Sequence, residues 1–330
     1  MPRSSFQKLK IIYIMEYLLK NSDEDHAVTT SQIIAYLKSH DITAERKTIY
    51  SDIDALRDFG LDIIQVSEGN NHGYYVASRD FELPELKLLV DSVQSSKFIT
   101  HKKTLSLIKK IEKLASIHSA QLLIRQVFVK NRIKTMNESI YYTVDAIPNA
   151  IAQNKKIRFQ YFQWNVKKEA ELKRDGKRYE VSPWGLSWDD EYYYLIGYDS
   201  DAGIIKHYRV DKMLSIKVEN KVREGRYKFK EPDMVTYDKK MFNMFNGEER
   251  NVEILCENSL AGVMIDRFGK DVRITKVDNG HFQVVVKVAA SMHFVHWIMA
   301  LGDGVKIVAP DSLVEQIREE INRLANKYSK

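Results

Sequence analysis

The sequence predicts an α+β protein of several domains, and three features of the chain indicate this fold class. Apolar residues recur at helical spacing near the N-terminus, in 5–20 and again in 44–58. Short runs rich in aromatic and β-branched residues, with Gly and Asp between them, fill the centre from 157 to 211. Beyond residue 250, strand and helix patterns follow in the order β-α-β-β-α-β. A chain of 330 residues has room for about two or three domains.

The composition is that of a globular protein with an excess of positive charge. Hydrophobic residues make up 44% and charged residues 29%, and the net charge of +6 is compatible with a polyanionic partner such as nucleic acid. No apolar run approaches the roughly 18 residues of a membrane span, and the N-terminus lacks an apolar signal core. The single cysteine, Cys256, excludes an internal disulfide and a cysteine-based zinc cluster within one chain. We therefore expect a cytoplasmic protein.

Residues 1–79 begin with three predicted helices. Thr29 or Thr30 is expected to cap the second helix, and Thr43 is expected to cap the third, which covers 44–58. The turn between the second and third helices is short. This layout is typical of a helix-turn-helix.

A predicted hairpin follows the third helix. Gly60 stands at the helix end, where a left-handed residue is favoured. Strands are expected at 61–66 and 74–76, joined by a loop of turn-forming residues at 67–73. Beside a helix-turn-helix, such a hairpin would be the wing of a winged DNA-binding domain.

The outer face of the third helix carries the argument for DNA binding. Ile49, Ile53 and Leu56 recur at i, i+4 and i+7, so they define its buried stripe. The helix dipole disfavours cations in the first turn by about 0.3–1 kcal/mol each, whereas phosphates and base edges favour them. The alternative is an ordinary solvated face, and Asp54 is unfavourable for DNA on this side. We expect the leading DNA contacts to be Arg46, Lys47, Thr48, Tyr50 and Ser51.

Residues 80–145 predict a helical linker. Leu83-Pro84-Glu85 places a proline in the first turn of one helix, and Thr100 is expected to cap another. Such apolar, lysine-rich helices either connect the DNA-binding part to the central module and pair two protomers, or pack as a core of their own chain. The sequence does not separate these roles.

The central module, 146–222, is predicted to be a small barrel or curled sheet. Alternation places Tyr161 and Arg158 on opposite faces of one strand, and His207 and Arg209 on the same face of another. Cationic and hydroxyl side chains among aromatic rings suit a flat, anionic ligand. The alternative is a twisted sheet whose polar face is only solvated.

Three motifs in this module resemble those of the WYL-domain transcriptional regulators of bacteria. They are Ser182-Pro183-Trp184-Gly185-Leu186, Tyr193-Tyr194-Leu195-Ile196-Gly197-Tyr198-Asp199 and Tyr208-Arg209-Val210-Asp211. The triplet that names the family is Tyr193-Tyr194-Leu195 here, with tyrosine in place of tryptophan. Thr48-Ile49-Tyr50-Ser51-Asp52-Ile53 and Gly73-Tyr74-Tyr75 also resemble the winged domains that precede WYL modules. The resemblance covers nearly the whole chain.

The resemblance implies an N-terminal winged helix-turn-helix, an Sm/SH3-like β-barrel that senses a ligand, and a C-terminal extension. It also implies that the barrel binds a nucleic-acid-derived or nucleotide effector, such as single-stranded DNA. Within the matched motifs, Trp184 either stacks on a base or packs inside, and packing is favoured. Arg158 and Tyr161 are candidates from alternation and proximity alone. The expected effector contacts are Arg158, Tyr161, Ser182, Trp184, His207 and Arg209.

The rest of the chain is a polar connection at 223–249 and a predicted ferredoxin-like sandwich at 250–330. Val284, Val286 and Val288 alternate along one strand and are expected to face the helices. The pattern resembles the C-terminal extension found behind WYL modules.

The sequence contains no catalytic constellation. It has neither a glycine-rich phosphate loop nor a Gly-x-Ser-x-Gly elbow. His293 and His296 are three apart on a predicted helix, but no nearby Cys, Asp or Glu completes a zinc ligand set. Asp189-Asp190-Glu191 suits a solvated turn between strands. We expect no enzyme activity, no cofactor and no metal.

The sequence therefore predicts a homodimeric, ligand-responsive transcription factor that binds an operator in double-stranded DNA. The main alternative is a protein that binds single-stranded DNA or RNA and has no promoter target, with the barrel as its working surface. A nucleic-acid-processing enzyme is a third possibility, which the missing catalytic residues disfavour.

Overall fold

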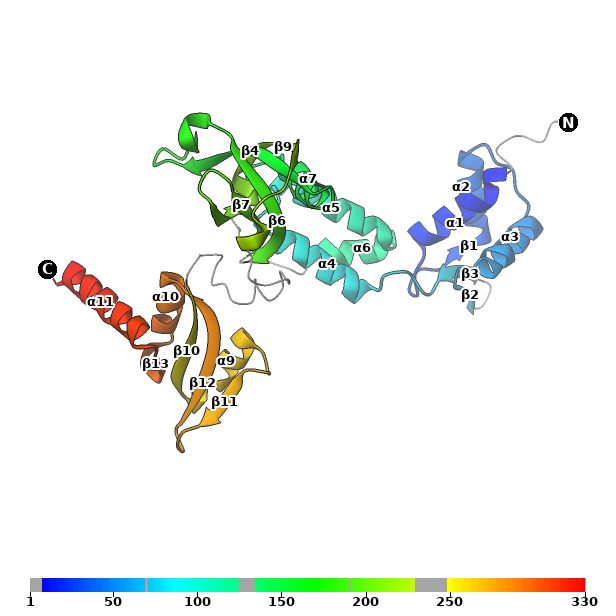
Figure 1. Ribbon diagram of the computed structural model, residues 1–330. Helices are drawn as coiled ribbons and strands as arrows, with labels where there is room; N and C mark the ends of the chain where they lie inside the picture. The colour runs from blue at the N-terminus through cyan, green and yellow to red at the C-terminus, as the bar shows by residue number, and fades with distance from the viewer. Residues whose placement is uncertain (1–7, 69–70, 125–133, 190, 229–247, 330) are drawn as a thin grey trace. The chain divides into compact units, whose positions relative to one another are not determined.

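The computed structural model describes residues 8–68, 71–124, 134–189, 191–228 and 248–329. The chain is mixed α+β, with helices first and several antiparallel sheets after them, which confirms the predicted class at that level (Figure 1). It forms two compact units, Met1–Glu138 and Ser139–Lys330. Among the described residues, no helix combines the length and the apolar character needed to cross a membrane.

The first unit opens with three helices and a small sheet. The helices are α1 (Lys10–Asn21), α2 (Thr30–Ser39) and α3 (Arg46–Asp58), and the strands β1 (Val28–Thr29), β2 (Ile63–Glu68) and β3 (Asn71–Val76) pair in the order β1-β3-β2. Ile14, Leu18, Ile33 and Ile53 meet in one buried core. Because each such side chain contributes about 1.5–3 kcal/mol on burial, this core holds the helices against the sheet.

The helix ends confirm one predicted cap and correct another. Thr29 Oγ1 accepts a hydrogen bond from Gln32 N at 3.3 Å, and the Gln32 side chain accepts one from Thr29 N at 2.7 Å, which closes a capping box on α2. The prediction that Thr43 caps the next helix was wrong. That helix begins at Arg46, and Glu45 occupies the cap position without a side-chain hydrogen bond.

The hairpin of β2 and β3 is longer than the sequence predicted. Pairing continues through polar residues, and Ser67 Oγ lies 2.8 Å from His72 Nδ1 across the strands. Gly73 lies inside β3 rather than in a loop. A Cβ atom there would approach Ala27 Cβ to 2.8 Å, so the glycine permits the close approach of the neighbouring chain. The tip at 69–70 lies outside the described residues.

Further helices complete the first unit. They are α4 (Leu83–Ser95), α5 (His101–Ile111) and α6 (Ile117–Ile124), with a 3-10 turn at Glu112–Leu114. Thr100 caps α5 as predicted, accepting a hydrogen bond from Lys103 N at 3.3 Å. Leu86, Val90 and Ile108 belong to a buried cluster of these helices. They thus have a core of their own, and the pairing of protomers stays a prediction.

The second unit begins with α7 (Ile140–Ala152) and a half-barrel. Its strands are β4 (Lys155–Trp164), β5 (Ala170–Leu172), β6 (Tyr179–Asp189), β7 (Tyr192–Asp199), β8 (Ile204–Arg209) and β9 (Met213–Val222), with 3-10 turns at Lys173–Gly176, Val210–Lys212 and Arg226–Lys228. The strand order is β5-β4-β6-β7-β8, and β9 pairs with β4. Ile157 and Phe159 are fully buried and Arg158 between them is exposed, as the alternation predicted.

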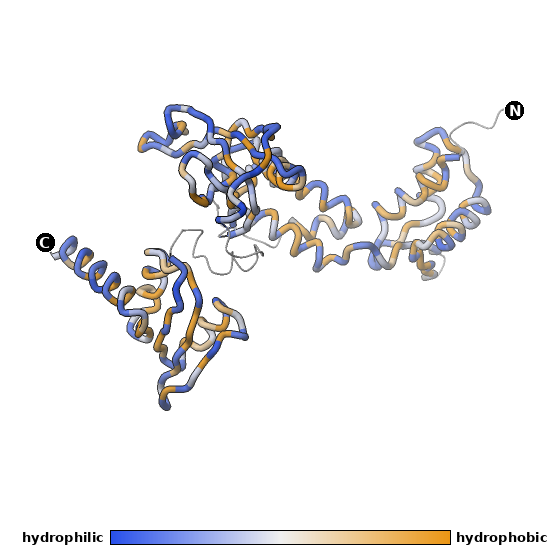
Figure 2. Tube along the Cα trace, viewed as in Figure 1, coloured by the Kyte–Doolittle hydropathy of each residue, from blue (hydrophilic) through white to orange (hydrophobic). Residues whose placement is uncertain are grey.

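The last part of the chain is a four-stranded sheet with helices. It comprises β10 (Glu248–Glu257), a 3-10 turn at Asn258–Leu260, α9 (Ala261–Phe268), β11 (Arg273–Lys276), β12 (His281–Ala290), α10 (Met292–Ala300), a 3-10 turn at Gly302–Gly304, β13 (Val305–Ala309) and α11 (Asp311–Tyr328). The antiparallel order is β11-β12-β10-β13. Val284, Val286 and Val288 are buried with α9, α10 and α11 side chains, as predicted. Figure 2 shows α11 as largely hydrophilic, with apolar residues at intervals.

Candidate DNA-binding and effector-binding surfaces

The outer face of α3 presents all five predicted DNA contacts to solvent. Arg46, Lys47, Thr48, Tyr50 and Ser51 are exposed, while Ile49, Ile53 and Leu56 on the other side are buried. Arg46 Nη2 donates to Ser31 Oγ of α2 at 3.3 Å. The first turn of α3 contains no acidic residue. Exposed cations at a helix start suit a phosphate backbone, while the exposed Glu45 at the cap position adds one negative charge there.

The unfavourable acid on this face is paired within the helix. Asp54 Oδ1 lies 2.9 Å from Arg57 Nη1, one turn further along. Arg57 also donates through Nε to Ile63 O at 2.9 Å, which ties the end of α3 to β2. The Asp54 carboxylate therefore does not stand as an uncompensated negative charge next to the predicted contacts.

Three of the predicted effector contacts share one face of the β6–β7–β8 sheet. The register pairs Ser182 with Tyr198, Ile196 with His207, and Tyr194 with Arg209. Side chains directly opposite each other on neighbouring strands point to the same side. Ser182, His207 and Arg209 thus lie on one face together with Tyr194 and Tyr198.

Two neighbours hold the Arg209 guanidinium at one end of this face. Its guanidinium donates from Nε to Asp211 Oδ1 at 3.1 Å and from Nη2 to Asp211 Oδ2 at 2.8 Å, and it stacks 3.6 Å from the ring centre of Tyr192. Burial lowers the pKa of Arg209, but the bonds to Asp211 outweigh it and leave the pKa raised. The group is therefore a fixed, permanently charged fork.

The side chain of Tyr161 lies beside Arg209 and contacts the backbone of Arg209, not its guanidinium. The Tyr161 hydroxyl accepts a hydrogen bond from Arg209 N at 3.1 Å. Burial raises the pKa of Tyr161 to about 12, so the hydroxyl stays neutral at physiological pH. The structure thus brings Tyr161 and Arg209 together.

Ser182 and Trp184 bind Glu224, which follows β9, the last strand of the half-barrel. Ser182 Oγ accepts from Glu224 N at 2.9 Å, and Trp184 Nε1 donates to Glu224 O at 2.8 Å. Arg223 covers the indole at 4.1 Å and donates from Nη1 to Pro183 O at 2.8 Å. Trp184 is half-buried, with Arg223 over its ring. No sequence pattern indicated the part that Arg223 and Glu224 play.

Arg158 lies apart from the other candidates. Its side chain is 45% exposed, and its neighbours are Glu219 at 3.6 Å and Glu180 at 4.0 Å. Because alternation sends it to the face opposite Tyr161, the structure does not bring these two candidates to one place.

A buried carboxylate that the sequence did not single out organises the barrel interior. Asp199 Oδ2 accepts from Lys206 Nζ at 2.6 Å, from the Tyr208 hydroxyl at 3.0 Å and from Arg174 Nη2 at 3.4 Å. Burial raises the pKa of Asp199, but the bond from Lys206 and the others outweigh it and lower the pKa. Asp199 falls inside a matched motif, but its place in the motif does not reveal this role.

His296 contacts a carboxylate of α11, and Cys256 is buried in the core. His296 Nε2 lies 3.1 Å from Glu320 Oε1, and the rings of His293 and His296 are 6.5 Å apart. Burial raises the pKa of Cys256 to about 11, which keeps the thiol protonated. In the part of the chain that the structure describes, no three His, Cys, Asp or Glu residues could hold a metal ion.

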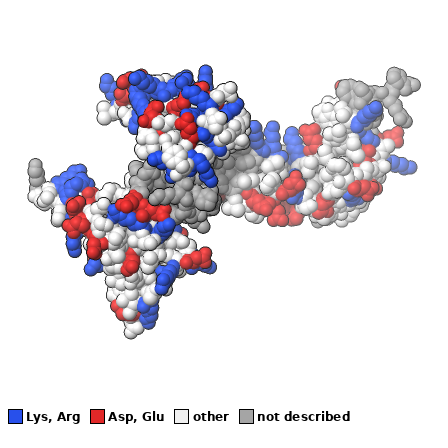
Figure 3. Space-filling model, viewed as in Figure 1, with Lys and Arg blue, Asp and Glu red and all other residues white. Residues whose placement is uncertain are grey.

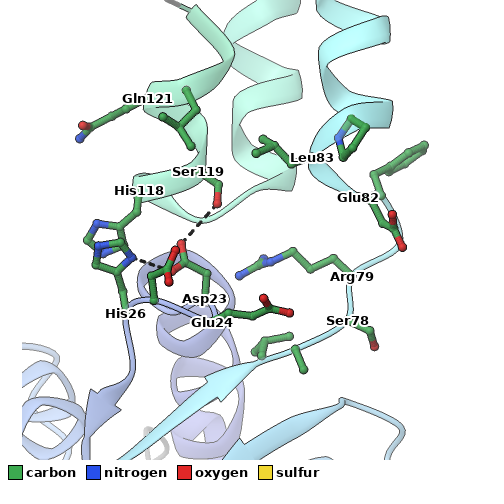
Figure 4. A pocket seen from close by; sticks show the side chains of 16 residues that line it. Asp23, Glu24, His26, Ser78, Arg79, Glu82, Leu83, His118, Ser119 and Gln121 are labelled. Atoms are coloured by element: carbon green, nitrogen blue, oxygen red, sulfur yellow. Dashed lines mark hydrogen bonds and ion pairs between the residues drawn. The ribbon is translucent and has the colours of Figure 1, made fainter.

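The first unit contains a cavity of 630 Å³ that includes Asp23, His26, Arg79 and His118 (Figure 4). Asp23 accepts hydrogen bonds from Ser116 and from other neighbours, and the rings of His26 and His118 stack 3.7 Å apart at 4°. Burial raises the pKa of Asp23, yet these hydrogen bonds outweigh it and lower the pKa. Within the lining, Asp23 bonds to His26 and Ser119, while Arg79 donates to Ser22 O.

Family models match two parts of this chain. The WYL domain matches residues 142–218 and the WCX domain matches residues 248–325. The first match contains the shared face of Ser182, His207 and Arg209, and the second contains the four-stranded sheet with its helices. No curated protein matches the sequence.

Among solved structures, the chain is similar to the proteasome accessory factor B/C (PafBC) of Arthrobacter aurescens, with 16% identity and a TM-score of 0.28 over 97% of this chain and 49% of that one. It is also similar to a CRISPR Cas-related protein, with 13% identity and a TM-score of 0.24 over 98% of this chain and 83% of that one. The chain thus spans about half the length of the PafBC chain. The chain thus carries a stretch that matches the WYL domain, followed by one that matches the WCX domain.

Proposed function

We propose that this chain is a ligand-responsive, DNA-binding transcriptional regulator. In this proposal the first 79 residues form a winged helix-turn-helix that binds a duplex operator, the WYL domain is an Sm/SH3-like barrel that binds an effector, and the WCX domain is a ferredoxin-like sandwich. The protein would act in the cytoplasm as a homodimer. It would bind nucleic acids and catalyse no reaction on them.

One observation carries the proposal: two separate cationic surfaces occur in the two units of one chain. The start of α3 exposes Arg46 and Lys47 beside hydroxyl groups. The WYL domain fixes the Arg209 guanidinium on a face with Ser182 and His207. The first suits a duplex backbone, and the second suits a smaller anion such as a nucleotide or a short single strand.

The effector is proposed to act by preferring one arrangement of the dimer. A ligand shifts such an equilibrium only by the difference in its affinity for the two states. The Arg209 fork is a suitable sensor, because its position depends on Asp211 and Tyr192 together. A phosphate that draws the guanidinium away from Asp211 would alter both contacts at once.

Two variants separate the two surfaces. Lys47→Gln should weaken binding to DNA that flanks the protein's own gene and lower the salt slope of that binding by about 0.9, because one phosphate contact is lost. Arg209→Lys keeps the charge but loses the forked donors, so it should abolish the response to effector while duplex binding persists. Footprinting and gel-shift titration measure both.

The control is Arg318→Lys, which alters an exposed arginine of α11 paired with Glu315. Loss of duplex binding in folded Arg209→Lys would contradict the division into two surfaces. If footprinting finds no duplex site, the chain is instead a single-strand-binding protein. Cleavage of either strand on adding divalent metal would contradict the absence of catalysis.

A further inference from the structure

The cavity of 630 Å³ in the first unit lies where the opening helices and small sheet meet the helices that follow them. Its walls come from the turn at 23–26, from the end of β3 and the residues after it, and from the starts of α4 and α6. Cavities of about 300–1,000 Å³ have the size that binds small molecules. The proposed effector face belongs to the WYL domain, so this cavity is a separate place in the other unit.

Two of the carboxylates that line the cavity are engaged at helix starts. Asp23 accepts a hydrogen bond from the Ser116 hydroxyl just before α6, and it bonds to His26 Nδ1 at 2.6 Å. Glu82 is the cap residue of α4, where its side chain accepts from the backbone N–H of Glu85. Carboxylates are favoured at the positive end of a helix. These two acids are therefore occupied within the fold.

Apart from the stacked histidines, the other charged groups of the lining are one cation and two carboxylates. They are Arg79, Glu24 and Asp25, and none of them has an ion-pair partner among the described residues. The Arg79 guanidinium donates from Nη2 to Ser22 O at 2.8 Å, which leaves its other donors for a ligand. Burial lowers the pKa of Arg79, and the charge of Asp23 opposes this only in part. The cavity thus offers free charges of both signs.

The free charges lie beside an apolar wall. Figure 4 shows Arg79 and Glu24 directed into the same space, with Leu83 of α4 close by. Phe81 and Leu122 also line the cavity, and they are 39% and 47% exposed. Apolar side chains that stand open at a cavity gain from a ligand that removes them from water.

We infer that this cavity binds a small zwitterion, namely an α-amino acid with a large apolar side chain. The forked donors of Arg79 receive its carboxylate, Glu24 pairs with its ammonium group, and its side chain covers Leu83 and Leu122. The planar guanidinium matches a carboxylate in shape as well as in charge. A ligand with one charge only would leave a group of the opposite sign in the cavity uncompensated.

The acids of the surroundings disfavour a phosphate or a nucleotide in this cavity. Figure 3 shows Asp and Glu side chains gathered around the connection between β3 and α4. Their repulsion grows with each negative charge of a ligand, and a single carboxylate beside its own ammonium group meets the least of it. The inference is therefore independent of the nucleic-acid effector proposed for the WYL domain.

The test is isothermal titration calorimetry of the full chain with L-phenylalanine and three analogues. Phenethylamine, which lacks the carboxylate, should bind about tenfold more weakly because the bonds from Arg79 are lost. The analogue without the ammonium group, 3-phenylpropionate, should bind about threefold more weakly, since Glu24 is an exposed partner. Glycine should bind about tenfold or more weakly, because it has no side chain to cover the apolar wall.

Two variants place the ligand in the cavity. Arg79→Lys keeps the charge but loses the fork, so it should weaken L-phenylalanine about tenfold and leave phenethylamine unchanged. Glu24→Gln should remove the preference for L-phenylalanine over 3-phenylpropionate. Because the Glu24 side chain is exposed, this second variant tests the inference even where Arg79→Lys does not fold.

The matched control is Glu16→Gln on α1, an exposed acid outside the lining, which should bind all four compounds as the wild type does. Failure of L-phenylalanine to bind the wild-type chain overturns the inference. Equal binding of 3-phenylpropionate and L-phenylalanine assigns the cavity to plain carboxylates and overturns it too, as does unchanged binding in folded Arg79→Lys. Oligonucleotide and operator binding are measured separately, so each of these failures leaves the proposed function standing.

Discussion

At the scale of single residues, the site depends on partners that the motifs do not reveal. Arg209 is recognisable in the sequence, because it belongs to a matched motif and shares a strand face with His207. Its guanidinium is fixed by Asp211, which belongs to the same motif, but the motif does not indicate this pairing. The stacking of Tyr192 on the guanidinium depends on the pairing of β7 with β8, which period-2 alternation alone does not specify.

Replacing Tyr161 with phenylalanine tests how far this network stabilises the domain. The change removes the hydroxyl that accepts from Arg209 N, and it leaves a partly buried N–H without a partner. We expect a loss of about 1–3 kcal/mol in the free energy of unfolding, measured by urea denaturation. The control is Tyr142→Phe, because that ring is 77% exposed and should tolerate the change. Equal stability of the two variants would contradict the structural role of Tyr161.

At the scale of helices and strands, the sequence predicted interiors better than ends. The buried valines of β12 and the buried stripe of α3 follow from periodicity alone, since every second or every third to fourth residue must face the core. The start of α3 was misplaced at Thr43. Several residues before Arg46 are able to cap a helix, so local propensity does not choose between them.

The length of the β2–β3 hairpin was mispredicted for a different reason, and the role of Glu224 was not predicted at all. Gly73 resembles a loop residue, but it lies in a strand where Ala27 of a neighbouring segment leaves no room for a Cβ atom. Likewise, Ser182 and Trp184 bind Glu224, some forty positions further along the chain. Contacts of such sequence separation leave no periodic trace, and only the folded chain reveals them.

The contact between α10 and α11 predicts a pH dependence. Glu320 accepts from Arg323 at 2.6 and 2.7 Å and lies 3.1 Å from His296, and these bonds, led by that from Arg323, lower its pKa from 4.5 to about 2. A carboxyl with a depressed folded pKa stabilises the folded state above its unfolded pKa. This contribution should therefore be complete above pH 4.5 and be lost as the pH falls toward 2.

Thermal unfolding followed by circular dichroism across that range measures the effect. Glu320→Gln should flatten the part of the pH profile that belongs to the WCX domain. Glu315→Gln is the matched control on the same helix, because Glu315 is 59% exposed in its pair with Arg318. A profile unchanged in Glu320→Gln would show that the carboxylate does not link the two helices.

At the scale of the whole molecule, the order of domains could be predicted, because each stretch carries its own pattern of spacing. Alternation in the centre and the β-α-β-β-α-β order at the end are local properties of the chain. The match to WYL and WCX models at 142–218 and 248–325 agrees with that order. The dimer and its interface were expected from the resemblance and stay predictions.

If effector and operator act through one equilibrium, their effects must be reciprocal. The factor by which a bound strand changes operator affinity should equal the factor by which the operator changes strand affinity, because both describe one coupling free energy. Titrating a labelled operator with and without strand, and a labelled strand with and without operator, measures the two. Unequal factors would exclude a closed equilibrium between the two sites.

The indole of Trp184 has a further consequence. The same ring that holds the departing chain through Glu224 lies under the guanidinium of Arg223. A planar molecule that stacks on this ring must displace the guanidinium. Displacement breaks the hydrogen bond from Arg223 to Pro183 O. Occupancy of the indole would thus weaken the contacts that hold residues 223 and 224 against the barrel.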